Sequence, residues 1–130
     1  MAVWYPMPGS IRMAKKIEAG LKEFAASCRQ IAGCGLTRCS SGNVSWRSGK
    51  DTMFIKCSRA WLGEVTANDV AVCRISDGAS LNEKRPSVEF AFHAGILRKR
   101  PDVNVVLHFQ TPYATALACT GRKWIYYFVL

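Results

Sequence analysis

Apolar residues recur at helical spacing along the first quarter of the chain. They fall on one face of a helix with 3.6 residues per turn: Ile11, Ala14, Ile17, Leu21, Phe24, Cys28 and Ile31. Ser10 is available as an N-cap, and Gly33 or Gly35 can end the last turn. The pattern predicts a long amphipathic helix from Ser10 to about Ala32, with one face against a core.

Shorter segments rich in apolar and β-forming residues come next. Asn43 to Arg47 and Thr52 to Cys57 flank the polar turn Ser48-Gly49-Lys50-Asp51, which predicts a β-hairpin. Thr66-Ala67-Asn68-Asp69 is typical of a single capped turn, and it leads into a third predicted strand, Val70 to Ile75. These elements indicate an antiparallel start to a sheet.

The remaining pattern predicts a helix, a strand and a helix. The helix is expected to begin near Pro86-Ser87, because proline suits a first turn, and to run to about Arg100 before Pro101. A fourth strand is expected from Val103 to Phe109, and Thr111-Pro112 opens the last helix. With no internal repeat or linker, the sequence predicts a single α/β domain.

Composition fits a soluble domain. The chain has 130 residues, of which 49% are hydrophobic and 21% are charged. No apolar run approaches the ~20 residues that span a bilayer, and Met1 to Pro8 lacks the layout of a signal peptide, so we expect a cytoplasmic protein and no membrane partner. The six cysteines could form disulfides, but they are scattered without CxxC pairs and we expect them to be reduced.

The net charge of +9 favours anionic partners such as nucleic acid, acidic surfaces or phosphorylated metabolites. The basic clusters, of which Arg98-Lys99-Arg100 is the longest, have no interleaved aromatic residues. This distribution argues against nucleic-acid binding and is typical of solvated faces and helix ends. Nucleic-acid binding would show a steep dependence on salt.

Candidate ligands for a metal ion stand near a predicted helix start and on a predicted strand. Because side chains alternate along a strand, His108 and Gln110 are expected to share one face while Phe109 points to the other. Glu89 lies at the helix start. The turn Ser40-Ser41-Gly42-Asn43 allows backbone N–H groups to approach an anion, although such a turn is by itself more often structural.

Four segments in order along the chain resemble the class II aldolase and adducin-head family, which includes L-fuculose-phosphate aldolase and ribulose-phosphate 4-epimerase. The resemblance implies a three-layer α/β/α fold around a mainly antiparallel mixed sheet, usually in a homotetramer with sites at subunit contacts. It covers the N-terminal part of the family domain, here residues 1–119. The segments are Gly35 to Ser45, Met53-Phe54-Ile55 with Ser58, Pro86 to His93, and Arg100 to His108.

The resemblance also implies roles for individual residues. Glu89 matches the acid-base residue of carbon–carbon cleavage, and His108 matches the first metal-binding histidine. Gln110 stands where a second metal-binding histidine is usual. Zinc is the divalent ion expected from the family. The phosphate-binding positions are Gly42, Asn43, Ser58 and Ser87.

Three departures from the family pattern change these expectations. The amide of Gln110 is a poorer zinc ligand than imidazole, and the third histidine of the family lies beyond Cys119, where this chain has no match. We therefore expect weak or absent zinc binding. Arg59 replaces the usual glycine after Ser58, and it either blocks the backbone cradle or binds a phosphate or carboxylate itself. His93 is expected to be a packing residue.

Residues 120–130 form an unmatched tail that ends in seven apolar or aromatic residues, Trp124 to Leu130. Such a segment can pair at a sheet edge, lie in an oligomer interface or mark a premature end of a longer protein, and we favour the last. A shortened domain is expected to be marginally stable and to self-associate.

The sequence thus predicts a metal-dependent lyase domain for retro-aldol cleavage of a small sugar phosphate or related hydroxy-ketone, acting as a homo-oligomer. A non-catalytic interaction module of the adducin-head type is the alternative. Gln110, Arg59 and the missing third ligand favour the module, whereas Glu89, Asn43 and His108 favour the enzyme. The particular substrate stays open, because one fold serves several reactions.

Overall fold

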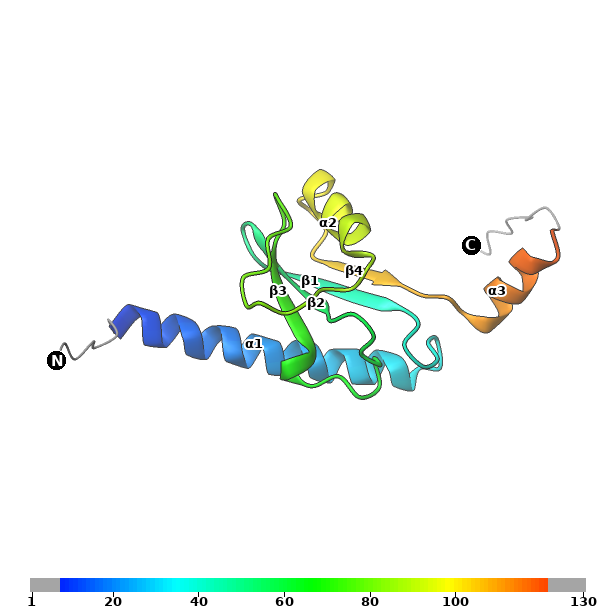
Figure 1. Cartoon of the computed structure of the whole chain (residues 1–130), viewed down its shortest axis with the longest axis horizontal. Helices are drawn as coiled ribbons and strands as arrows, with labels where there is room; N and C mark the ends of the chain where they lie inside the picture. The colour runs from blue at the N-terminus through cyan, green and yellow to red at the C-terminus, as the bar shows by residue number, and fades with distance from the viewer. Residues whose placement is uncertain (1–7, 122–130) are drawn as a thin grey trace.

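The computed structural model describes residues 8–121, with side chains from residue 13 onward. Three α-helices, four strands and one 3-10 turn alternate along this part of the chain (Figure 1). In order they are α1 (Pro8–Gly33), β1 (Asn43–Gly49), β2 (Thr52–Lys56), η1 (Ala67–Asp69), β3 (Val70–Arg74), α2 (Phe90–Lys99), β4 (Val105–His108) and α3 (Pro112–Cys119).

The strands form one sheet in the order β3-β2-β1-β4. All three pairings among the described strands are antiparallel, and β1 and β2 form the predicted hairpin. Strand β4 pairs with β1 on the side away from β2, with Asn43 opposite His108. Asn43, the first residue of β1, and His108, the last residue of β4, therefore meet at the same end of the sheet.

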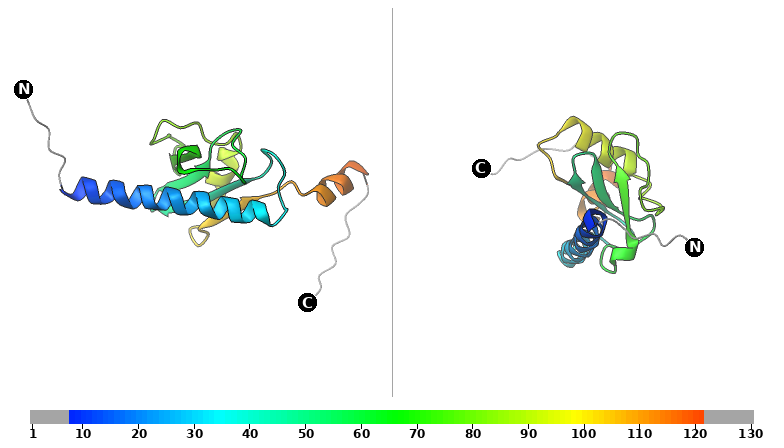
Figure 2. Two further views of the ribbon diagram at one scale, coloured as in Figure 1. Left: turned by 90° about the horizontal axis from the view of Figure 1, so that it is seen from below. Right: turned by 90° about the vertical axis from the view of Figure 1, so that its left-hand side faces the viewer.

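Helices cover both faces of the sheet. Figure 2 shows α1 running along one face and α2 lying over the other. Side chains of β2 alternate between the two layers, because Phe54 packs on the α1 side and Met53 and Ile55 pack on the α2 side. The predicted three-layer α/β/α arrangement around a mainly antiparallel sheet is confirmed, and within residues 8–121 every strand pairing is antiparallel.

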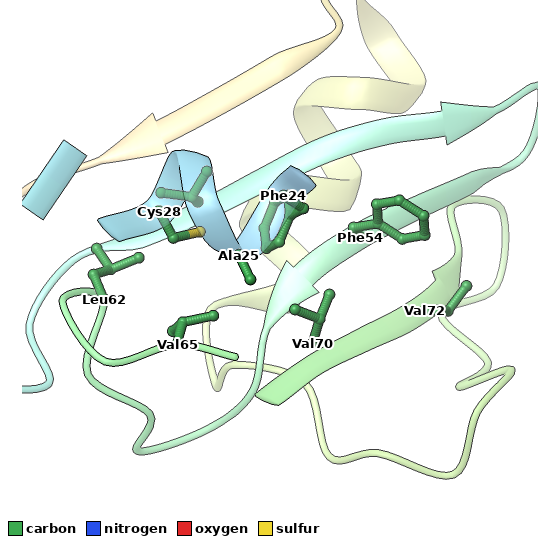
Figure 3. Close-up of a cluster of buried hydrophobic side chains, with 9 residues drawn as sticks. Phe24, Ala25, Cys28, Phe54, Leu62, Val65, Val70 and Val72 are labelled. Atoms are coloured by element: carbon green, nitrogen blue, oxygen red, sulfur yellow. The ribbon is translucent and has the colours of Figure 1, made fainter. Parts of the chain in front are cut away.

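The core beneath α1 contains buried apolar side chains from the helix, from three strands and from the loop between β2 and η1 (Figure 3). Phe24, Trp46 and Phe54 form an aromatic cluster with ring centroids 6.1–6.5 Å apart. Only the C-terminal half of α1 joins this core, since Met13 and Ile17 are 68% and 42% exposed. The predicted apolar face is thus covered over part of its length.

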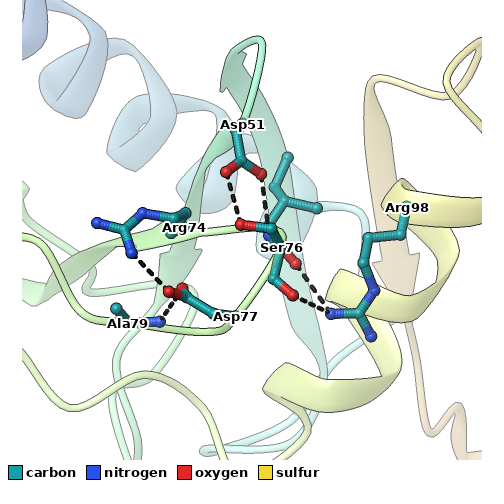
Figure 4. Close-up of polar contacts among 7 residues, drawn as sticks. Asp51, Arg74, Ser76, Asp77, Ala79 and Arg98 are labelled. Atoms are coloured by element: carbon teal, nitrogen blue, oxygen red, sulfur yellow. Dashed lines mark hydrogen bonds and ion pairs between the residues drawn. The ribbon is translucent and has the colours of Figure 1, made fainter.

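Polar contacts fasten α2 to the hairpin and to the end of β3 (Figure 4). Asp51 accepts hydrogen bonds from the backbone N–H and the hydroxyl of Ser76, at 2.9 and 2.6 Å. The Arg98 guanidinium in turn donates to the carbonyls of Ile75 and Ser76. These bonds link the β1–β2 turn, the segment after β3 and α2.

Two predicted helix starts were wrong. Helix α1 begins at Pro8, so Ser10 lies inside the helix and is not its N-cap. Helix α2 begins at Phe90 rather than near Pro86-Ser87. The reason is that Pro86 pairs with Cys57 in an isolated β-bridge and the Ser87 N–H donates to the Lys56 carbonyl, which keeps this segment extended along β2.

Other boundaries differ by one or two residues. Strand β4 covers Val105–His108 rather than Val103 to Phe109, and β3 ends at Arg74. The capped turn at Thr66 is present as a capping box, and all six cysteines are free thiols. The apolar stretch from Trp124 lies outside the described residues. No helix within residues 8–121 is long and apolar enough to cross a membrane.

Candidate active site

Three elements meet where β1 begins, β4 ends and the loop before α2 passes β2. Asn43 opens β1, and both it and Ser87 are buried. The Ser87 hydroxyl donates to Asn43 Oδ1 at 2.5 Å and accepts a hydrogen bond from the Glu89 N–H at 3.3 Å. Ser87 therefore ties the start of β1 to the residue that precedes α2.

Gly42 has a conformation and a space that require glycine. Its φ angle is +80°, and a Cβ at this position would lie 2.7 Å from Thr37 Cγ2 and 3.2 Å from the His108 carbonyl oxygen. The missing side chain lets the backbone pass close to the end of β4. The predicted glycine turn thus brings the loop before β1 close to His108 at the end of β4.

A pocket of about 360 Å³ opens at this junction. Its lining is mostly polar and comes from the loop before β1, the end of β2 and the loop before α2. It includes all four residues predicted to bind phosphate. The lining residues are Ser40, Ser41, Gly42, Asn43, Lys56, Ser58, Arg59, Ser87, Val88, Glu89 and Gln110.

Lys56 is a pocket residue that the sequence analysis missed. It ends β2 and is only 2% exposed, and its ammonium group donates to the carbonyls of Ser40 and Ala60 at 3.3 and 2.7 Å. Burial lowers the pKa of Lys56, because removal from water disfavours the charged form. Within the described residues this lysine has no carboxylate partner, so the pocket offers an anion an uncompensated positive charge.

Arg59 follows Ser58 at the edge of the same pocket. Its φ angle of +65° lies in the left-handed region, which costs a non-glycine residue about 1–2 kcal/mol. Arginine therefore occupies a backbone conformation that glycine adopts more easily. The side chain of Arg59 is exposed and has no hydrogen bond or ion pair within residues 8–121.

Glu89 and His108 form the closest pair of candidate catalytic groups. Glu89 is the N-cap residue of α2 but its carboxylate makes no capping bond, and Oε2 lies 2.5 Å from His108 Nδ1. The two groups are about one third exposed, and of the two only Glu89 lines this pocket. His108 Nδ1 is buried and lacks hydrogen-bond geometry to any described partner, so the contact is an ion pair when the histidine is protonated.

Gln110 lies outside the strand that was expected to position it. Since β4 ends at His108, strand alternation does not extend to Phe109 and Gln110. Gln110 is exposed and lines the polar pocket, whereas His108 lines a neighbouring one. A shared strand face for the two side chains therefore stays a prediction, and the two pockets that they line share Glu89.

The neighbouring pocket is less polar and has a volume of about 390 Å³. Val88, Ala91 and Phe92 line it together with Glu89 and His108. Val88 is 80% exposed and Phe92 is 53% exposed, and the Phe92 ring centroid lies 5.7 Å from that of His108. Glu89 thus stands between a cationic polar pocket and an apolar one.

His93 lies beneath this site as a buried packing residue. It is fully buried in α2, and its Nδ1 lies 2.7 Å from the Ser45 hydroxyl on β1. Burial, with a smaller contribution from His108, lowers the pKa of His93 to about 4. The imidazole is therefore neutral at pH 7 and holds α2 against the sheet.

The described residues do not complete a zinc site. His108 and Glu89 supply one imidazole and one carboxylate, and no group of three or more His, Cys, Asp or Glu side chains within residues 8–121 is arranged to hold a metal ion. Catalytic zinc usually takes three protein ligands. Gln110 could add only a neutral amide oxygen, so this donor set does not fit catalytic zinc.

Comparisons with known proteins agree with this architecture. The model of the Class II Aldolase and Adducin N-terminal domain matches residues 22–128. A 5-methylthioribulose-1-phosphate/5-deoxyribulose-1-phosphate aldolase from Rhodospirillum rubrum is 39% identical over 116 residues, which are 89% of this chain and 49% of that protein. A methylthioribulose-1-phosphate dehydratase from Sodalis glossinidius is 34% identical over 98 residues, 75% of this chain and 49% of that protein.

Solved structures of aldolases have a similar fold. The present fold is similar to an L-fuculose 1-phosphate aldolase with a TM-score of 0.67 and 29% identity, over 77% of this chain and 48% of that one. The chain spans about half the length of the curated relatives it matches. These relatives are named enzymes that carry a sugar phosphate in their names. The chain belongs to the class II aldolase and adducin family.

Proposed function

We propose that this chain carries part of a lyase site for retro-aldol cleavage of a small phosphorylated sugar or hydroxy-ketone. The observation that carries the proposal is the position of Glu89, which contacts His108 and lies between a cationic pocket and an apolar pocket. An anionic end of a substrate and a less polar end can then lie on opposite sides of one carboxylate.

Glu89 is the proposed acid-base residue. In a retro-aldol step a base removes the proton of the hydroxyl beside the bond that breaks, an aldehyde leaves, and a proton is returned to the enediolate that remains. The Glu89 carboxylate is reached from the pocket and is not used in capping α2, so it is free to exchange a proton. His108, 2.5 Å away, orients that carboxylate.

The polar pocket is the proposed phosphate site. Gly42, Asn43, Ser58 and Ser87 line this pocket, which supports the phosphate role that the resemblance gives them, and we add Lys56. The buried ammonium of Lys56 gives the pocket a fixed positive charge and joins the loops that contain Ser40 and Ala60. A phosphate bound here would neutralise that charge.

A divalent ion would be held by His108, with Gln110 as the proposed second and weaker ligand. Such an ion supplies electrostatic stabilisation of an enediolate when it is bound. Because the described donor set falls short of the usual three ligands, the proposal assigns this chain the proton and phosphate roles and assigns no step to a metal.

The apolar pocket and the relatives together suggest the shape of the substrate. Two of the similar proteins are named for 5-methylthio and 5-deoxy sugar phosphates, whose far ends are apolar. Val88, Ala91 and Phe92 offer such an end an apolar wall next to Glu89. We propose that the substrate is a ketose phosphate with an apolar group at the end away from the phosphate.

The test is an aldehyde-release assay with a panel of ketose phosphates and added zinc, manganese or magnesium. Glu89→Gln should reduce turnover at least about 100-fold, the usual contribution of a general acid or base. Tyr113→Phe, a change on an exposed side chain that lines neither pocket, serves as the control. Turnover that survives Glu89→Gln would contradict the acid-base assignment.

A non-catalytic interaction module is the second candidate function. The incomplete donor set around His108 and the arginine at position 59 favour it, since both depart from the pattern of a complete aldolase site. It predicts no aldehyde release from any member of the panel with any of the three metals. It also predicts that Glu89→Gln leaves phosphate binding and folding unchanged, because Glu89 would then have no chemical role.

A further inference from the structure

The loop that follows β2 offers few backbone donors to an anion. The Ser58 N–H donates to the Arg85 carbonyl, and the Ala60 N–H donates to the Cys57 carbonyl. Of the three successive amides 58–60, only that of Arg59 has no acceptor within the described residues. A cradle made of backbone amides is therefore largely occupied at this side of the pocket.

The side chain of Arg59 is a possible donor to an anion at the same side of the pocket. Arg59 lines the polar pocket and is exposed, and its guanidinium has no ion pair or hydrogen bond within residues 8–121. Among residues 8–121, the only carboxylate that lines the pocket is that of Glu89, which contacts His108. A planar guanidinium that is free of other partners matches the geometry of a phosphate, which it can bind through two parallel hydrogen bonds.

The backbone at this position strengthens the argument. A φ angle of +65° favours glycine, and arginine adopts it here at a cost in backbone strain. Strained residues persist where the surrounding structure fixes them, and they cluster at ligand sites. The strain and the free guanidinium at the pocket edge are two separate observations about the same residue.

We propose that Arg59 is a phosphate-binding residue that replaces a backbone cradle with a guanidinium contact at the mouth of the polar pocket. The inference rests on the proposed function only in that the pocket takes a phosphate group. It places the buried ammonium of Lys56 at the deep end of the pocket and the exposed guanidinium of Arg59 at its outer edge. The anion would then lie between these two positive charges.

The experiment measures the dissociation constant of inorganic phosphate by NMR titration at constant ionic strength, using the full chain. Arg59→Gln removes the charge, and Arg59→Gly removes the charge together with the backbone strain. We expect both variants to weaken phosphate binding about tenfold, as loss of a charge-assisted contact does. Arg59→Gly should melt at or above the wild-type temperature, which shows that the loss is not caused by unfolding.

Lys50→Gln is the matched control, because this exposed turn residue lines neither pocket and its change removes one positive charge. It should leave the dissociation constant unchanged. Unchanged binding in Arg59→Gln would overturn the proposal. Tighter binding in Arg59→Gly would overturn it as well, since arginine would then obstruct the cradle.

Ser87→Ala separates this inference from the proposed function. If Ser87→Ala weakens phosphate binding while Arg59→Gln does not, the phosphate pocket stands and the role of Arg59 fails. If the wild-type chain binds no phosphate at tens of millimolar, both the pocket assignment and the role of Arg59 fail.

Discussion

Gly42 is the residue at which the shape of the site depends most directly on a single position. Gly42→Ala adds a Cβ 2.7 Å from Thr37 Cγ2 at a φ angle of +80°, so it combines overpacking with backbone strain. We expect it to lower the free energy of unfolding by about 2–4 kcal/mol in denaturant titration. It should also weaken phosphate binding, because the clash displaces the loop before β1.

Gly35→Ala provides the matched comparison. Gly35 has a similar φ angle of +73°, but a Cβ there meets nothing within 4 Å. Its substitution should cost about 1 kcal/mol, from strain alone, and should leave phosphate binding unchanged. Equal losses of stability in the two variants would show that the contact with Thr37 is unimportant.

His93 should make stability depend on pH in the mildly acidic range. Its pKa falls from 6.5 to about 4 in the folded protein, so between these values the unfolded chain binds a proton that the folded chain does not. Stability is therefore complete above about pH 6.5 and is lost as the pH falls toward 4. At about 1.4 kcal/mol per pKa unit the loss approaches roughly 3 kcal/mol.

Urea unfolding of the wild type and of His93→Gln between pH 7 and 4 measures this effect. Glutamine can keep a hydrogen bond to Ser45 but does not titrate, so the variant should show a much shallower slope. Carboxyl groups with lowered pKa values, such as that of Asp69, contribute mainly below about pH 4 and affect both proteins equally. Parallel curves for the two proteins would contradict the assignment.

Some residues of the candidate site could be predicted from the sequence, and others could not. Glu89 and His108 were expected near one another from the family resemblance, and they are in contact. The burial of Lys56 could not be predicted, because a lysine at the end of an apolar strand is usually solvated. The side chain is buried by the loop that contains Ala60, whose carbonyl accepts a hydrogen bond from it. The left-handed backbone of Arg59 could not be read from the residue type, which disfavours it.

Among the elements, α2 is the one that sets the position of Glu89, and Arg47 of β1 holds its other end. The Arg47 guanidinium donates to the carbonyls of Leu97, Arg100 and Val103 at 2.6–3.4 Å. The bond to Leu97 satisfies a carbonyl in the last turn of α2, where a helix leaves carbonyls without partners, and the other two fasten the segment that follows the helix. The strand that begins with Asn43 thus also fixes the C-terminal end of α2.

Arg47→Met should therefore destabilise the chain by about 2–3 kcal/mol and increase hydrogen exchange of the α2 amides. The reason is that two partly buried carbonyls lose a charged donor at once. Arg100→Met is the control, because Arg100 pairs with Asp102 on the surface and its loss should change exchange little. Equal exchange in the two variants would contradict the role of Arg47.

Element prediction was most accurate where the pattern was local. The β1–β2 hairpin and the capped turn at Thr66 depend on neighbouring residues and were predicted correctly. The segment around Pro86 was predicted to be helical because proline suits a first turn, but its pairing with Cys57 is a contact across 29 positions that no local pattern contains. Because of the same pairing, α2 begins later in the chain than predicted, and the Ser87 hydroxyl lies within hydrogen-bond distance of Asn43.

For the molecule as a whole, the incomplete donor set leads to a prediction about metal binding. With His108 and Glu89 as the described ligands, zinc titration by calorimetry should show affinity weaker than micromolar. His108→Ala should reduce whatever binding is observed. Submicromolar affinity that His108→Ala abolishes would contradict this prediction and would require a further ligand elsewhere in the chain or from a second copy.

The exposed apolar surface leads to a prediction about association. Within the described residues α3 has no buried side chain, and Tyr113 and Leu117 are 91% and 41% exposed. Figure 1 shows α3 standing away from the sheet, and the N-terminal half of α1 extends beyond the opposite side. Apolar side chains at such positions favour contact with a second copy, because association removes their surface from water.

We therefore expect the isolated chain to elute from size-exclusion chromatography as species larger than a monomer, with a distribution that depends on concentration. The double variant Tyr113→Ser/Leu117→Gln should shift it toward the monomer, because these exposed positions lose apolar area without affecting a described core. Lys50→Gln serves as a control for general changes of surface charge. A compact wild-type monomer at every concentration would contradict self-association. Oligomers that persist in the double variant would show that the contact lies elsewhere on the chain. Met13 and Ile17 of α1 are then the next exposed apolar positions to change.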